Sequence, residues 1–149
     1  MTVKRIAVLA SGRGANFQAV IDAIAKGEIP ATCCGLITDN PEAYAIERAK
    51  KAGIPVHIVD YSDYPAKESY EQALCSVMKE LSADLYILAG YMRILGGGIV
   101  RAFHGRLINI HPALLPCFPG LHAQRQALHY GVKVSGCTVH FVEERMDSG

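Results

Sequence analysis

Short, continuously apolar runs alternate along this chain with longer amphipathic runs, and this alternation limits the folds that the chain can adopt. Strand patterns cover residues 6–10, 32–38, 55–59, 84–89, 107–110 and 137–142. Strands that are apolar along their whole length and are joined through helices are typical of a parallel sheet buried on both faces. We therefore predict an α/β fold with a mostly parallel, twisted sheet and helices on both faces.

Helical patterns occupy most of the intervals between these strands. They cover residues 16–26, 41–51, 65–81, 99–104 and 123–130. In the second of them, Asn40 is the expected N-cap, Pro41 and Glu42 suit the first turn, and Gly53 ends the helix. No linker, repeat or low-complexity segment interrupts the pattern, so we predict one domain.

The composition excludes several classes of protein. Half of the 149 residues are apolar and 19% are charged, which is a globular composition without a disorder signature. A formal net charge of +1 creates no basic field for nucleic acid, and no apolar stretch suits a signal peptide or a membrane span. We expect a cytoplasmic protein that binds small molecules and neither nucleic acids nor membranes.

The five cysteines of the chain form no C-x-x-C pair. Cys33 and Cys34 are adjacent within a predicted strand, so their side chains are expected to point to opposite faces of the sheet. This pattern favours buried thiols in a reducing compartment over a disulfide framework.

The first polar cluster follows the first predicted strand. Ligands of such sheets bind beyond the carboxyl ends of the strands, and here the sequence Ser-Gly-Arg-Gly-Ala-Asn at 11–16 opens a helix. The amides at the start of that helix can hold a phosphate group. Because Phe17 replaces the third glycine of a dinucleotide motif, a single phosphate is the ligand hypothesis that remains. The alternative is a plain turn that binds nothing.

Asn109 and His111 lie at the end of the fifth predicted strand and are two residues apart. Such residues project from the same face of a strand, so both side chains can reach one cleft. An amide donor beside an imidazole suits acyl transfer, in which an oxyanion is stabilised and a proton is moved. The alternative is a capping asparagine and a structural histidine, although the long proline-rich loop that follows favours a site.

Asp147 follows the last predicted strand, where a carboxylate could approach His111 and favour the imidazolium. By itself, Asp147 also fits an ordinary solvated turn. The histidine spacings do not suit a zinc site, and Cys117 lies in a loop with no helix N-terminus to activate it as a nucleophile. His140 lies within a predicted strand and is assigned to the core.

Four stretches of the sequence together resemble the phosphoribosylglycinamide formyltransferase family. They are Ser-Gly-x-Gly-x-Asn at 11–16, Leu-Ala-Gly-Tyr-Met-Arg-Ile-Leu at 88–95, Asn-Ile-His-Pro-Ala-Leu-Leu-Pro at 109–116 and Phe-Pro-Gly-Leu-His at 118–122. Methionyl-tRNA formyltransferases and formyltetrahydrofolate deformylases share the Asn-x-His and Leu-Pro elements. The Pro-Gly-Leu-His stretch and the glycine loop favour the glycinamide ribonucleotide enzymes.

The resemblance implies a Rossmann-like formyltransferase fold and a division of roles among the residues. Gly14, Ala15 and Asn16 would hold the substrate phosphate, and Asn109, His111 and Asp147 would be the catalytic group. The folate pocket would be lined by Met92, Arg93, Ile94, Leu95, Val142, Glu143 and Glu144. The implied reaction transfers a formyl group from 10-formyltetrahydrofolate to the amine of glycinamide ribonucleotide in de novo purine synthesis, without a metal.

The resemblance also bears on the extent of the domain. Residues 1–149 are expected to form one catalytic domain, with a phosphate-binding part at about 1–90 and a folate-binding and catalytic part at about 91–149. Members of the family continue past the Asp-x-Gly turn, so we expect a C-terminally truncated chain. Two alternative functions stay open at this stage: a deformylase-like hydrolase and a non-catalytic folate- or nucleotide-binding fragment. Assembly of the chain into an oligomer is also left open.

Overall fold

The computed structural model describes residues 3–149 and contains one mixed sheet. Within these residues the strand order is β3-β2-β1-β4-β5-β6. The strands are β1 (Lys4–Leu9), β2 (Ala31–Thr38), β3 (Val56–Ile58), β4 (Leu85–Leu88), β5 (Leu107–His111) and β6 (Thr138–Phe141). β1 to β5 are parallel, and β6 pairs antiparallel with β5 at the edge. The predicted mostly parallel sheet is confirmed.

The order in which strands are added to the sheet reverses at β1: β2 and β3 lie on one side of it, and β4 and β5 lie on the other. From β1 the chain moves outward through β2 and β3, and it then returns to the other side of β1 through β4 and β5. In open α/β sheets this switch point leaves a crevice at the carboxyl ends of the strands. The segments that follow β1, β4 and β5 therefore meet at one end of the sheet.

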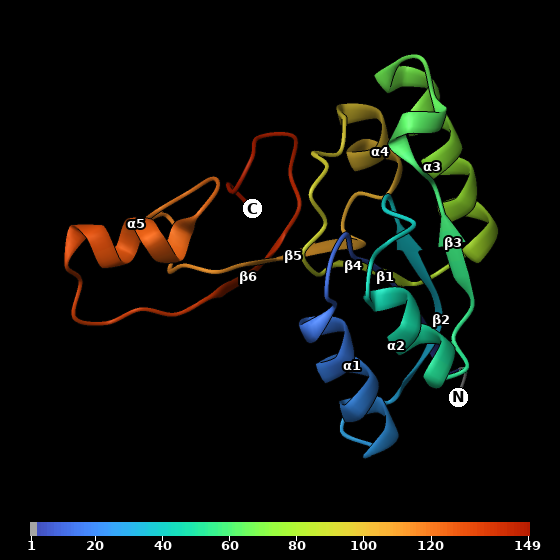
Figure 1. Cartoon of the computed structure of the whole chain (residues 1–149), viewed down its shortest axis with the longest axis horizontal. Helices are drawn as coiled ribbons and strands as arrows, with labels where there is room; N and C mark the ends of the chain where they lie inside the picture. Colours follow the sequence, from blue (N-terminus) through green and yellow to red (C-terminus); the bar gives the residue numbers. More distant parts are fainter. Residues whose placement is uncertain (1–2) are drawn as a thin grey trace.

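Four helices cover the two faces of the sheet, as the sequence predicts (Figure 1). α1 (Ala15–Ala25) and α2 (Ala45–Lys51) lie on one face, and α3 (Lys67–Leu81) and α4 (Gly97–Ala102) lie on the other. A short 3-10 helix, η1 (Tyr61–Asp63), precedes α3. Alternate residues of the strands enter two separate cores, so that Val8 packs beneath α1 and α2 while Leu9 packs beneath α3 and α4. Cys33 and Cys34 likewise contact opposite cores.

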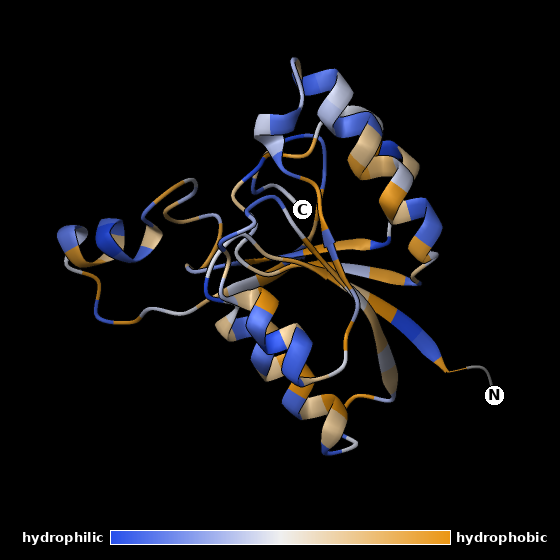
Figure 2. Cartoon of the chain, turned by 45° about the vertical axis from the view of Figure 1, so that its right-hand side comes forward, coloured by the Kyte–Doolittle hydropathy of each residue, from blue (hydrophilic) through white to orange (hydrophobic). Residues whose placement is uncertain are grey.

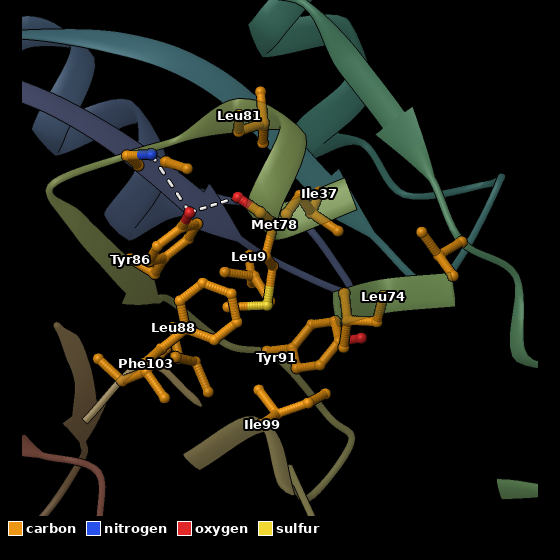
Figure 3. Close-up of a cluster of buried hydrophobic side chains, with 14 of the residues drawn as sticks. Leu9, Ile37, Leu74, Met78, Leu81, Tyr86, Leu88, Tyr91, Ile99 and Phe103 are labelled. Atoms are coloured by element: carbon orange, nitrogen blue, oxygen red, sulfur yellow. Dashed lines mark hydrogen bonds between the residues drawn. The ribbon is translucent and has the colours of Figure 1, made fainter. Parts of the chain in front are cut away.

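The core beneath α3 and α4 is anchored by Tyr86, whose side chain is fully buried (Figure 3). Its hydroxyl donates a hydrogen bond to the carbonyl of Met78 and accepts one from the amide of Ala83 at 3.2 Å. Its ring packs edge-on against Phe103, with 5.0 Å between centroids. Tyr86 thereby connects β4 with α3 and with the C-terminal end of α4. These contacts fix the strand from which the next segment of the chain begins.

The start of α2 differs from the prediction. The helix begins at Ala45 and not at Pro41, and Asn40 is not its N-cap. The side-chain oxygen of Asn40 instead accepts a hydrogen bond from the amide of Glu42 at 2.9 Å, while its amide group donates to the carbonyl of Ser11 at 3.2 Å. An asparagine that bonds the backbone two residues on closes a turn, and this turn competes with the helix.

α5 (Ala123–Tyr130) forms at the predicted residues but does not cover the sheet. Figures 1 and 2 show it on an arm that extends away from the strands between β5 and β6. Leu128 and Tyr130 remain 82% and 80% exposed, respectively. In the part of the chain that the structure describes, no helix has the length and apolarity needed to cross a lipid bilayer.

Candidate active site

A cleft of about 620 Å³ opens at the carboxyl ends of β4 and β5. Its walls come from the start of α1, the segment after β4, the end of β5, the proline-rich loop and the segment after β6. The volume lies in the range of small-molecule sites, about 300–1,000 Å³. All three predicted catalytic residues line it, together with all seven predicted folate-binding residues.

Asn109 and His111 reach the cleft from the C-terminal end of β5, as their spacing predicts. β5 lies between β4 and β6: Asn109 is paired with both neighbouring strands, and His111 is paired with Thr138 of β6. His111 is buried, whereas Asn109 is partly exposed. The rigid strand therefore presents an amide and an imidazole side by side.

Asp147 lies against His111 and is not a solvated turn residue. Its Oδ1 is 3.6 Å from His111 Nδ1, and the two side chains are only 8% and 5% exposed. Its Oδ2 accepts a hydrogen bond from the amide of Gly120 at 2.8 Å. The carboxylate therefore connects the segment after β6 with both β5 and the proline-rich loop.

Each ring nitrogen of His111 faces an acceptor. Nε2 is 2.8 Å from the carbonyl oxygen of Phe118, and Nδ1 faces the Asp147 carboxylate. Since a carbonyl can only accept, Nε2 carries a hydrogen and donates it to Phe118. The Asp147 carboxylate is too far from Nδ1 for a hydrogen bond, but it faces that nitrogen across a short, buried gap.

His140 belongs to the same group, although the sequence assigned it to the core. It is buried, but its Nε2 lies 3.4 Å from Asn109 Nδ2 and 4.0 Å from Asp147 Oδ1. Its Nδ1 lies 3.0 Å from the carbonyl of Phe141, to which it can donate. That tautomer leaves Nε2 as an acceptor for the Asn109 amide. The signal that was missed is the antiparallel register of β5 and β6, which pairs Asn109 with His140.

The segment after β4, residues 90–96, is tied to the domain at several points. The amide of Met92 donates to Ser11 Oγ at 2.8 Å, and the amide of Gly96 donates to Glu71 Oε1 at 2.7 Å. The hydroxyl of Tyr91 bonds that of Tyr70 on α3, and burial raises the pKa of Tyr91. The backbone of this cleft wall is therefore fixed, while the Met92 side chain remains 67% exposed.

Arg93 lies between this cleft and a second cavity of about 550 Å³. Its Nε donates to Asp39 Oδ2 at 3.0 Å, and its guanidinium lies over the ring of Tyr61, 4.1 Å from the centroid. Asp39 also lines the second cavity. A buried carboxylate and an aromatic ring thus hold the arginine at the boundary of the two spaces.

The predicted phosphate loop lines the cleft only in part. Asn16 lines the cleft, whereas Gly14 and Ala15 lie outside its lining. Gly14 has φ 72°, and a Cβ there would lie 2.8 Å from the Cβ of Ala45, so glycine is required for packing and backbone geometry alone. The first amides of α1 have no acceptor within the helix, which leaves them available to an anion.

Comparison with known proteins identifies the family. Residues 4–149 match the formyl transferase family. The chain belongs to this family. Its sequence is 43% identical over 147 residues to phosphoribosylglycinamide formyltransferase of Bacillus subtilis, covering 99% of this chain and 75% of that protein.

Other members of the formyl transferase family are similar in sequence and in structure. The chain is 48% identical to the trifunctional purine biosynthetic protein adenosine-3 of Drosophila melanogaster, covering 98% of this chain but only 11% of that protein. The crystal structure of glycinamide ribonucleotide transformylase 1 from Symbiobacterium toebii superimposes with a TM-score of 0.95 at 48% identity, covering 99% of this chain and 69% of that one. The predicted Rossmann-like formyltransferase fold is confirmed.

Membership of the formyl transferase family implies a formyl donor of the folate type. The cleft suits such a group, because exposed apolar side chains, including those of Met92, Ile94 and Met146, line it. Across residues 3–149, no three His, Cys, Asp or Glu side chains are grouped as metal ligands. Cys117, the cysteine nearest to His111 in the sequence, is exposed in the arm and does not line the cleft. Cys33 lies in β2, and burial raises the pKa of its thiol to about 11.

Proposed function

We propose that this domain transfers a formyl group from 10-formyltetrahydrofolate to the amine of glycinamide ribonucleotide, a step of purine synthesis. The observation that carries the proposal is the cluster of Asn109, His111, Asp147 and His140 in a cleft that can accept a small molecule. Relatives named phosphoribosylglycinamide formyltransferase support the choice of substrates.

In the proposed reaction the formyl carbon forms a bond to the substrate nitrogen and loses its bond to the folate nitrogen, which takes up a proton. Asn109 supports the oxygen of the formyl group as negative charge develops on it. One hydrogen of its amide faces His140 Nε2, and the other can be donated to that oxygen. The Nδ1–H of a His111 imidazolium provides a second donor and a proton source, because no hydrogen bond to Asp147 occupies it at 3.6 Å, whereas Nε2 donates to the carbonyl of Phe118.

Asp147 has two proposed tasks. Its Oδ1 faces His111 Nδ1 and favours the charged imidazole, while its Oδ2 is already engaged by the amide of Gly120. As a carboxylate at the edge of the cleft, it can also accept the proton that the attacking amine loses, directly or through water. Neither task requires a metal ion.

We further propose how the two ligands are bound. The folate lies along Met92, Arg93, Ile94, Leu95, Val142, Glu143 and Glu144, and the substrate phosphate lies at Gly14, Ala15 and Asn16. These assignments divide the domain into a phosphate-binding part at about 1–90 and a folate-binding and catalytic part at about 91–149. The common cleft lining from Asn16 to Asp147 supports one continuous site.

The test is incubation of the chain with 10-formyltetrahydrofolate, with and without glycinamide ribonucleotide. Loss of the formyl donor that depends on the amine supports the proposal. Loss without the amine would show a hydrolase, and folate binding without turnover would show a binding module. Either of these results overturns the proposed transfer.

Replacement of Asn109 tests the assigned chemistry. Loss of one oxyanion donor costs about a hundred- to a thousandfold in kcat, and we expect this for Asn109→Ala. The matched control is Gln72→Ala, which removes an exposed amide side chain from α3. Near-normal turnover of the Asn109 variant would contradict the assignment.

A further inference from the structure

An ion pair from α4 and a histidine–carboxylate contact from just beyond α4 connect this part of the chain with the segment that carries Asp147. We call this segment, residues 142–149, the Asp147 loop. Arg101 Nη1 donates to Glu144 Oε2 at 2.9 Å, and His104 Nε2 lies 3.9 Å from Glu143 Oε2. Two consecutive carboxylates of the loop thus face Arg101 on α4 and His104 just beyond its C-terminal end.

The Asp147 loop has few other attachments. At its start the amide of Val142 donates to the carbonyl of Leu107 at 2.9 Å, and the Val142 side chain packs against the core beneath α3 and α4. Near its end Asp147 accepts from the amide of Gly120 and faces His111 and His140. Across positions 143–146, every hydrogen bond or ion pair from the loop to another part of residues 3–149 ends on α4 or on His104 just beyond it. Between its two ends, the polar contacts of the loop with the rest of the described chain are therefore the Arg101–Glu144 ion pair and the longer His104–Glu143 contact.

Gly97 makes room for the Arg101–Glu144 ion pair. A Cβ at this position would lie 2.8 Å from Arg101 Nη1 and 3.0 Å from Glu144 Oε2. Glycine within a helix costs about 1 kcal/mol relative to alanine, so its presence in the first turn of α4 has a local disadvantage. A Cβ at position 97 would displace the end of the Arg101 side chain from its present contact with Glu144, whereas a Cβ at Gly98 would meet open space.

We propose that Arg101 is a positioning residue for Asp147. Through Glu144 it draws the Asp147 loop toward α4, and the loop then holds the carboxylate between His111 and Gly120. Arg101 itself does not line the cleft. Its effect on catalysis rests on the proposed function, but its effect on the position of the loop does not.

The amide of Gly120 reports on this position without any measurement of activity. It is hydrogen-bonded to Asp147 Oδ2, so its exchange with deuterium should accelerate when the loop loosens. Arg101→Glu places like charges together, and we expect faster exchange by about two- to fivefold, the range of an exposed ion pair. The charge-swapped double variant Arg101→Glu/Glu144→Arg should restore the original rate. Lys50→Glu, which breaks an equally exposed pair with Glu47 on α2, should change nothing.

A second variant separates positioning from helix stability. Gly97→Ala should displace the guanidinium from Glu144 while it favours the helix, and it should therefore also accelerate exchange at Gly120. Unchanged exchange in Arg101→Glu and Gly97→Ala, or no recovery in the double variant, overturns the proposal.

Turnover distinguishes the two proposals from each other. If the wild-type chain transfers formyl groups, Arg101→Glu should lower kcat by a similar two- to fivefold, and the swap should restore it. An effect on exchange in a chain that transfers no formyl group would overturn the proposed function and leave the role of Arg101 intact.

Discussion

Replacement of Asp147 by asparagine tests the central electrostatic contact of the site. Asp147 Oδ1 and His111 Nδ1 are 3.6 Å apart, and both side chains are almost fully buried, so solvent screens the contact weakly. In the proposed reaction His111 is an imidazolium, and at this distance two unit charges attract by about 4 to 5 kcal/mol with an effective dielectric constant of about 20, before the cost of burying them is subtracted. Asparagine has nearly the same volume but no charge, so most of this attraction is lost.

The geometry also predicts which form of the ring the variant favours. The amide of Gly120 needs an acceptor, so the asparagine oxygen should turn toward it and the NH₂ group toward His111. An N–H donor at Nδ1 favours the neutral imidazole, which cannot supply a proton from that nitrogen. We expect about 3 to 4 kcal/mol of lost transition-state stabilisation, or about two to three orders of magnitude in kcat.

The assay is steady-state formyl transfer, measured for Asp147→Asn and for the control Asp22→Asn. Asp22 is exposed on α1 and bonds only to the neighbouring Gln18 side chain in the structure. Exchange at Gly120 shows whether the loop has kept its place. A kcat within tenfold of wild type, with Gly120 still protected, would refute the role assigned to the Asp147 charge.

Four further predictions concern stability and reactivity. Gly14→Ala should lower the free energy of unfolding in urea by at least about 2 kcal/mol, because a positive φ is combined there with a steric clash. The control Gly27→Ala also has a positive φ but open space around it, and it should lower this free energy by only about 1 to 2 kcal/mol. Tyr86→Phe should cost about 1 to 3 kcal/mol in the same assay, since the buried amide of Ala83 loses its acceptor and the carbonyl of Met78 keeps only the amide of Ser82. Iodoacetamide at pH 8 should label Cys117 and spare Cys33, as peptide mapping would show, because the Cys33 pKa is raised from 9.0 to about 11. Folding keeps the Cys33 thiol protonated, whereas in the unfolded chain it ionises above pH 9. The free energy of unfolding in urea should therefore fall as the pH rises from 9 to 11.

Local sequence signals predicted the strands and several features of the site. Asn109 and His111 could be placed on one face because the side-chain period of a strand is two residues, whatever the rest of the fold is. α5 was predicted at its observed residues, and Gly131, in a left-handed conformation, ends it. The start of α2 was missed because Asn40 can either cap a helix or close a turn, and its contact with Ser11 favours the turn.

The amino-acid sequence by itself determined the alternating α/β architecture, the apolar strands and the pair Asn109 and His111, because these depend on periodicity and on neighbours along the chain. Only the tertiary structure decided the rest of the site. The antiparallel pairing of β6 with β5 brings His140 to Asn109, and the loop that follows β6 buries Asp147 against His111. Both contacts join residues more than thirty positions apart, and strand register and the ion pair on α4 set their distances.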